Sequence, residues 1–230
     1  MKFKPGFGAG ELSGSLGATV ASHSRYGPYF RTRVVPVNPA TTPQNTVRNN
    51  FAAASAFWKQ LTDTERNTWK AYAQTRPIID RLGASQVLTG NAIAVRINAR
   101  RMLGGNPLLR VPNISSNPDS LTAMSITADI GTGACAITFT PTPLAAGKAL
   151  AIYAAVLDSP GKSYIKNLFK FLCFTGAAQA SPYDYQADIE AKFGTLAVGQ
   201  IVVLNVHVYL VAAALLSTTM QARATVISTP

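Results

Sequence analysis

Acidic residues are scarce in this sequence. Its 230 residues include 10 Asp and Glu against 21 Lys and Arg, which gives a formal net charge of +11. The two histidines, His23 and His207, stand in no metal-ligand spacing such as HExxH. Acid–base and metal-dependent catalysis need clusters of such groups, so their scarcity argues against an enzyme. We therefore expect no catalytic residue, no metal, no cofactor and no small-molecule substrate.

Cysteines and long apolar runs are also few. Cys135 and Cys173 lie in apolar stretches without a CxxC pattern, which is typical of buried thiols, and whether they pair stays open. The longest apolar run, Ile201–Leu216, is interrupted by Asn205 and His207 and falls short of the roughly 20 residues that span a bilayer. The first residues lack the apolar segment of a secretory signal. We expect no membrane partner.

The excess positive charge is confined to one half of the chain. Residues 1–111 hold 15 Lys and Arg and 4 Asp and Glu, whereas residues 112–230 hold 6 basic and 6 acidic residues. A one-sided basic excess favours an anionic partner, either nucleic acid or an acidic protein surface. Most of these cations are arginines, which bind carboxylates as readily as phosphates. Charge alone therefore leaves both kinds of partner open.

Residues 1–41 are rich in glycine and proline, a composition that opposes a self-contained core. Aromatic residues are interleaved with arginines there, which suits a segment that lies on another surface. We predict an extended basic arm that contacts a partner, packs back on its own chain, or does both. Its main contacts are expected to be Tyr26, Tyr29, Phe30, Arg31 and Arg33.

Residues 42–106 carry the patterns of a small helical unit. Thr42 and Pro43 begin a first helix, whose apolar residues recur every three or four positions. Thr62 and Glu65 form a capping box that begins a second helix. A third helix is expected at about Gly90–Leu103. The apolar spacing predicts that the core of this unit consists of Phe51, Trp58, Leu61, Trp69 and Tyr72.

The hydrophobic period changes to two after a proline-rich linker, residues 107–119. Six strand-like runs follow, which favours an antiparallel β-sandwich over residues 120–230. In the fifth run Asn205, His207 and Tyr209 share one face, and aliphatic residues share the other. We therefore predict an α+β protein, in which an extended arm and a small helical unit precede a sandwich that folds as a domain of its own.

Two short stretches resemble known modules. The sequence FWKQLTDTERNTWKAYA, residues 57–73, is similar to the helix junction of HMG boxes, which bend DNA. The long basic third helix of such a box is missing, because the candidate third helix here is short. The sequence FGTLAVGQIVVLNVHVYL, residues 193–210, resembles a turn and central strand of fibronectin-type-III domains. The second resemblance implies an Ig-like sandwich.

A longer resemblance covers roughly residues 10–100. Its marks include Gly14, Gly17, Arg31, Arg33, Arg48 and the PVNP sequence at Pro36–Pro39. These features are similar to an N-terminal module of uncharacterised virion-associated proteins of tailed phages and prophages. The resemblance implies a non-enzymatic structural protein of a virion, made in the host cytoplasm, that binds itself and other virion proteins through the arm and helical unit, with the sandwich outward. The alternative is an architectural protein that binds nucleic acid through its basic half.

Overall fold

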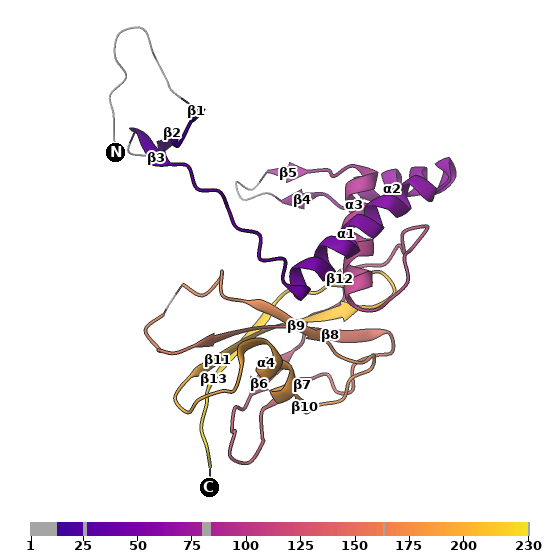
Figure 1. The fold of residues 1–230 in the computed structure, drawn as a ribbon. Helices are drawn as coiled ribbons and strands as arrows, with labels where there is room; N and C mark the ends of the chain where they lie inside the picture. The colour runs from indigo at the N-terminus through magenta and orange to yellow at the C-terminus, as the bar shows by residue number, and fades with distance from the viewer. Residues whose placement is uncertain (1–12, 25–26, 80–83, 163, 230) are drawn as a thin grey trace. The chain divides into compact units, whose positions relative to one another are not determined.

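The chain has a mixed α+β fold, as its sequence patterns predict (Figure 1). Its described residues form four helices and 13 strands, and the paired strands are antiparallel. The chain divides into two compact units, Met1–Gln44 and Asn45–Pro230. The computed structural model describes residues 13–24, 27–79, 84–162 and 164–229.

The first unit contains a three-stranded sheet instead of a fully extended arm. β1 (Gly14–Leu16), β2 (Thr19–Ser24) and β3 (Gly27–Thr32) pair in sequence order. Gly17, in the turn between β1 and β2, has a φ of 58°, a left-handed conformation that glycine adopts without steric cost. Residues 33–41 follow without regular secondary structure. Glycine here serves a turn between strands, which composition alone does not distinguish from a coil.

Three helices follow, α1 (Thr42–Gln60), α2 (Asp63–Gln74) and α3 (Gly90–Leu103). The predicted capping box is confirmed at the start of α2. The backbone N–H of Glu65 donates to Thr62 Oγ1, and the backbone N–H of Thr62 donates to Glu65 Oε2 at 2.8 Å. The third helix has the predicted bounds.

α2 and α3 approach each other closely at the start of α3. A Cβ atom on Gly90 would lie 2.9 Å from the backbone nitrogen of Lys70, so a larger residue would push the helices apart. The N-cap residue Thr89 accepts a hydrogen bond from the backbone N–H of Ala92 at 3.2 Å. The segment between the two helices includes a short hairpin of β4 (Ile78–Ile79) and β5 (Ser85–Gln86).

A five-stranded antiparallel sheet forms the centre of the second unit (Figure 1). Its strands are β8 (Lys148–Leu157), β9 (Lys170–Phe174), β11 (Ile201–Leu210), β12 (Leu215–Leu216) and β13 (Met220–Thr225). The strand order is β12-β11-β8-β9. β13 also pairs with β11, along Ile201–Val206, whereas β12 pairs with the end of β11 at Tyr209 and Leu210. β8 and β11 pair along their full length, with Tyr153 opposite Asn205 and Ala151 opposite His207.

The inner face of this sheet packs against a smaller sheet and against helix α4 (Gln186–Phe193). The smaller sheet has the order β10-β7-β6, formed by β6 (Ala123–Ile126), β7 (Ala136–Thr140) and β10 (Tyr183–Asp184). Two antiparallel sheets therefore face each other. Side chains from both sheets and from α4 form one apolar core, which includes Ile137, Leu150, Ile152, Ile189, Val202 and Leu204.

The helices cover part of the outer face of the five-stranded sheet. Trp69 of α2 and Ile93 of α3 share an apolar core with Ala151 and Tyr209 of the sheet. The helices from Asn45 onward and both sheets accordingly belong to one compact unit. This differs from the predicted arrangement, in which residues 107–119 separate a helical unit from an independent sandwich.

Residues 107–119 run along the helices and are fastened to them. The Trp69 indole Nε1–H donates to the Arg110 carbonyl at 2.8 Å. The Arg110 guanidinium binds the Glu65 carboxylate at 2.5 Å. This bond, followed by the hydrogen bond from the Thr62 backbone, lowers the pKa of Glu65 to about 2. The proline-rich segment thus connects the helices to the sheets without separating them.

The structure buries three of the five residues predicted for the helical core, namely Leu61, Trp69 and Tyr72. Trp58 is half-buried against them. Phe51 is 59% exposed, contrary to the prediction, because the buried part of α1 begins only near Ala54. Helical spacing identifies residues that share a face, but it does not show over what length a partner covers that face.

Candidate functional site

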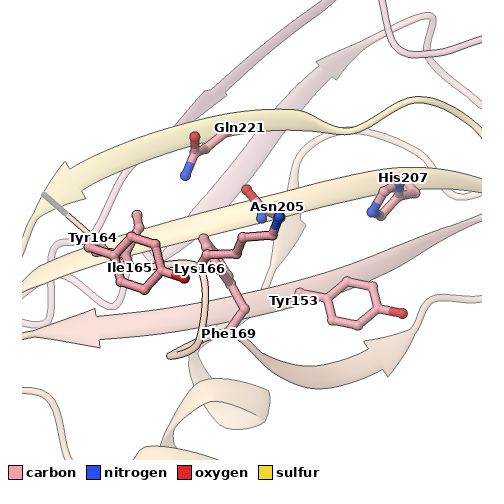
Figure 2. Close-up of a pocket in the computed structure, with 8 residues that line it drawn as sticks. All are labelled: Tyr153, Tyr164, Ile165, Lys166, Phe169, Asn205, His207 and Gln221. Atoms are coloured by element: carbon pink, nitrogen blue, oxygen red, sulfur yellow. The ribbon is translucent and has the colours of Figure 1, made fainter. Parts of the chain in front are cut away.

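An open groove lies on the outer face of the five-stranded sheet, beside the part that the helices cover (Figure 2). Its volume is about 430 Å³. β8, β11 and β13 form its floor, and the loop between β8 and β9 forms one wall. The lining residues are Tyr153, Tyr164, Ile165, Lys166, Phe169, Asn205, His207 and Gln221.

The polar floor of the groove results from the alternation of side chains between the two faces of β11. Asn205, His207 and Tyr209 of β11 lie on the outer face, as the period of two predicts. The helices bury Tyr209, which is 1% exposed. At the other end of the sheet Leu157 and Val203 belong to a separate small apolar cluster. Polar groups therefore remain open between two apolar zones of the same face.

Aromatic rings form a row across this outer face. The Tyr153 ring packs edge-on against His207 and Phe171, with centroid distances of 5.7 and 5.3 Å. Phe174 continues the row, at centroid distances of 4.8 Å from Phe171 and 4.3 Å from Tyr209. Edge-to-face contacts of this kind favour defined ring orientations. The row thus connects the groove with the helix-covered core.

The His207 ring is fixed by its hydrogen bonds. Its Nδ1 lies 3.0 Å from the Ser217 carbonyl oxygen. Because a carbonyl oxygen only accepts, Nδ1 carries a hydrogen, and Nε2 lies 3.4 Å from Thr219 Oγ1. No carboxylate among the described residues lies within ion-pair distance of this ring. His207 therefore has one orientation at the edge of the groove.

Asn205 places an unsatisfied polar atom in the groove. Its side-chain Oδ1 is buried, and no hydrogen-bond donor among the described residues reaches it. An unsatisfied buried acceptor costs about 1–3 kcal/mol of stability. Gln221 pairs with Asn205 across β13 and β11, and Lys166 extends over the sheet toward Asn205 (Figure 2).

The groove offers binding groups for a polar ligand. Asn205 and Gln221 supply amides, Lys166 supplies an ammonium, and Tyr153 and Tyr164 supply aromatic surface. None of the lining residues carries a carboxylate or a thiol. The arrangement can bind and orient a ligand.

A separate group of ionisable side chains lies where β9 meets α4. Cys173 Sγ donates to Asp188 Oδ2 at 3.1 Å, and the Tyr183 hydroxyl donates to the same oxygen at 2.7 Å. Burial raises the pKa of the Cys173 thiol to about 12, and burial also raises the pKa of Tyr183. The thiol is therefore protonated at neutral pH and is a poor nucleophile. Cys135 is also a free, buried thiol.

The residues predicted as partner contacts fall into different settings. Tyr29, Phe30 and Arg31 are consecutive on β3, so their side chains alternate between the two faces of the small sheet. Tyr29 and Phe30 are half-buried, whereas Arg31 is exposed. Arg33 is also exposed and follows the strand. Tyr26 lies outside the described residues.

Large apolar side chains are exposed from the small sheet to the middle of α1. Val47 and Phe51 lie one turn apart on α1 and are 58% and 59% exposed, so they form one apolar stripe. Sequence reasoning assigned Phe51 to a core and did not single out the valines that precede α1. The other exposed apolar residues in this part of the chain are Leu16, Val34, Val35 and Val37.

Several arginines of the basic half act inside the fold. Arg101 is 6% exposed, and its Nη1 donates to the Val211 and Ala212 carbonyls at 2.7 and 2.8 Å. Arg100 Nη1 donates to the Ala214 carbonyl at 2.7 Å. These bonds fasten α3 to the turn after β11. Part of the positive charge therefore serves internal structure, for which the planar guanidinium with its five donors is well suited.

Comparison with known proteins adds no relative, because no family model, curated protein or solved structure matches this chain. In the part of the chain that the structure describes, no helix is long and apolar enough to cross a membrane. Among the same residues, no three His, Cys, Asp or Glu side chains gather closely enough to hold a metal ion. The resemblances to virion modules, HMG boxes and fibronectin-type-III domains therefore remain predictions.

Proposed function

We propose that this chain is a non-enzymatic structural subunit of a bacteriophage particle. It assembles with copies of itself and with other virion proteins through its N-terminal segment and the first half of α1, and the sandwich faces outward. The observation that carries the proposal is the run of exposed apolar side chains between Leu16 and Phe51. Exposed apolar surface of this kind marks sites where another protein binds.

The first half of α1 supplies one part of the assembly surface. Val47 and Phe51 form the exposed start of an apolar stripe, whose buried part includes Ala54 in α1 and Leu61 just after the helix. A neighbouring subunit that packs on this stripe would bury both exposed side chains. Complete burial of one side chain of this size contributes about 1.5–3 kcal/mol. One helix would then belong to its own core at its end and to an interface at its start.

Residues 33–41 supply the second part. Val34, Val35 and Val37 are exposed on a backbone without regular structure. Pro36 and Pro39 fix their own φ angles and so reduce the conformational entropy that this segment loses on docking. The segment suits burial against a neighbour, as the arm composition predicts. Arg31 and Arg33 add charged groups that can bind acidic side chains at the rim of such an interface.

The sequence resemblance is what supports assigning the protein to a phage particle. The resemblance of residues 10–100 to virion modules includes Arg31, Arg33 and the PVNP sequence, which lie in and beside the exposed apolar segment. The residues that carry the resemblance thus lie in the same segment as the exposed apolar residues of the proposed interface. This coincidence supports assembly into a particle over an unrelated binding role.

Nucleic-acid binding is the alternative function. The 15 cations of residues 1–111 favour it. The internal bonds of Arg100 and Arg101 and the ion pair of Arg110 with Glu65 weigh against it, because these groups are already engaged. The two functions differ in salt dependence, since binding to phosphates weakens steeply between roughly 50 and 200 mM salt.

A double substitution tests the assembly surface. Val47→Gln with Phe51→Gln removes the exposed stripe while retaining helix-compatible side chains. We expect a folded protein with an unchanged melting temperature that no longer assembles, measured by light scattering after size exclusion and by electron microscopy at high protein concentration. The matched control is Ile114→Gln with Val198→Gln, which removes two exposed apolar residues elsewhere in the second unit and should assemble normally.

Deletion of residues 2–34 tests the N-terminal segment in the same assays. A folded monomer is expected. If both altered proteins assembled as the unaltered chain does at physiological salt, the proposed surface would be wrong. The nucleic-acid function would replace the proposal on a different result. The chain would bind duplex DNA at about 50 mM salt, release the DNA at about 200 mM salt, and form no assembly at either salt concentration.

A further inference from the structure

A second pocket, of about 340 Å³, lies where the end of α2, one face of α3 and strand β12 meet. Arg76, Arg96 and Arg100 line it. Among the described residues, no carboxylate lines it or lies within ion-pair distance of these three arginines. In the part of the chain that the structure describes, three positive charges therefore face one cavity without a counter-charge, an arrangement that is unfavourable by Coulomb repulsion.

Two of the arginines are held in position by neutral acceptors. Arg100 Nη1 donates to the Ala214 carbonyl at 2.7 Å, and Arg76 Nη1 donates to Asn117 Oδ1 at 2.6 Å. Since a guanidinium has five N–H donors, both keep further donors for a ligand. Arg96 is exposed and makes no hydrogen bond with a described residue. The pocket thus combines two fixed guanidinium groups with one that is free to close on a ligand.

The electrostatic cost is visible at Arg100. Arg96 and Arg100 lie one turn apart on α3, on the same side of the helix. Burial lowers the pKa of Arg100, and the charge of Arg96 lowers it further. Both effects disfavour the positive charge that Arg100 carries. A bound anion would reverse the second effect and compensate the first.

Tyr72 provides a wall of the same pocket. The Arg76 guanidinium lies over its ring, 5.6 Å from the ring centroid. The Tyr72 hydroxyl is buried and has no hydrogen-bond partner among the described residues. A buried hydroxyl without a partner costs free energy. The pocket therefore contains both uncompensated charge and an unsatisfied polar group in its wall.

We propose that this pocket binds a phosphate group through Arg76, Arg96 and Arg100. The doubly charged phosphate matches three guanidinium groups better than a single carboxylate does, and guanidinium groups pair in bidentate fashion with its oxygens. The phosphate belongs either to free inorganic phosphate or to a phosphate monoester, both of which are dianions near neutral pH. The pocket is distinct from the groove of Figure 2 and from the stripe of Val47 and Phe51, so the proposal is independent of assembly.

Thermal unfolding of the full chain with sodium phosphate tests the proposal. The reference is sodium chloride at the same ionic strength and the same pH. The pH is about 7.5, because phosphate is mostly a dianion there. At a phosphate concentration about ten times Kd, we expect the melting temperature to rise by about 3–6 °C. Arg96→Gln should leave the melting temperature in chloride unchanged or raise it slightly, because Arg96 is exposed and its charge repels that of Arg100. It should weaken phosphate binding about tenfold.

Arg223→Gln is the matched control, because Arg223 is exposed on β13 and its replacement removes the same charge outside the pocket. It should keep the full phosphate response. Calorimetric titration with inorganic phosphate and with a nucleoside 5′-monophosphate, a phosphate monoester, separates the two sources: the ligand with the lower Kd identifies the source. Equal rises for the unaltered chain and Arg96→Gln, or a rise in acetate as large as in phosphate, would show a general salt effect and overturn the proposal.

Discussion

The two faces of the five-stranded sheet differ although one sequence alternation produces both. On the inner face aliphatic side chains such as Leu150, Ile152 and Val206 meet the smaller sheet and α4 in one continuous core. The outer face is divided into a helix-covered zone, an open polar groove and a small apolar cluster. The smaller sheet and α4 thus cover the inner face with one continuous core, whereas separate segments cover parts of the outer face and leave the groove between them.

The two faces also differ in the size of their side chains. The outer face of β8 presents Ala149 and Ala151 beneath the helices, and both are buried. Small residues there allow Trp69 and Tyr72 to lie close to the sheet. Close packing of large groups from the helices onto small groups of a strand is how a dense core accommodates both. The outer face is therefore built to receive helices, and the following predictions test how strongly it depends on them.

Removal of the helices should have the largest effect. We expect residues 112–230 alone to lose the cooperative unfolding transition, because Ala151 and Tyr209 become exposed and the bonds from Arg101 are lost. The comparison is a chain of residues 42–230, which keeps the helices and lacks the small N-terminal sheet; it should unfold cooperatively. Calorimetry and urea titration measure both. A sharp transition in residues 112–230 would show that the inner core suffices.

Truncation of the covering aromatic residue should have the next largest effect. Trp69→Ala should lower the free energy of unfolding by about 3–5 kcal/mol, as expected for a fully buried tryptophan. Trp58→Ala should cost about half as much, because Trp58 is half-buried. Chemical denaturation of both variants gives the comparison. Equal losses would contradict the difference in burial between the two positions.

Two asparagines offer the smallest test, with effects of opposite sign. Asn205→Val should raise the free energy of unfolding by about 1 kcal/mol, because it removes an unsatisfied buried acceptor from a strand. Asn98 of α3 is also buried, but it bonds the Leu109 N–H at 2.7 Å and its carbonyl at 3.3 Å. Asn98→Val should therefore lower the free energy of unfolding by about 1–3 kcal/mol. Destabilisation by both changes would show that Asn205 has a partner.

Local features of this fold are predictable from the sequence. The bounds Gly90–Leu103 of α3 and the capping box of Thr62 and Glu65 are confirmed, and a strand lies within each of the six apolar runs. These features depend on residues two to four positions apart, so the sequence displays them directly. α4 was not predicted, since it has eight residues and no side-chain hydrogen bond at its N-cap.

Features that depend on distant segments were not predictable. Tyr209 alternates with Asn205 and His207 and carries the same pattern, yet helices from far earlier in the chain bury it. Phe51 shows the opposite outcome: it has the helical spacing of a core residue, yet it is exposed, and no described segment covers it. Arg76, Arg96 and Arg100 meet at one pocket only after the turn of the chain between α2 and α3. The polar interruption of the apolar run by Asn205 and His207 was the one sequence signal for the groove.

The bond between Arg101 and the Val211 carbonyl has a consequence for synthesis of the chain. The two residues are 110 positions apart in the sequence. At translation rates of 5–20 residues per second, Val211 is made roughly 6–20 s after Arg101. During that interval the helices are already made, while the strand that Trp69 packs against is still missing. The nascent chain therefore presents an apolar helical surface until β11 arrives, and that surface is where a chaperone would bind during translation.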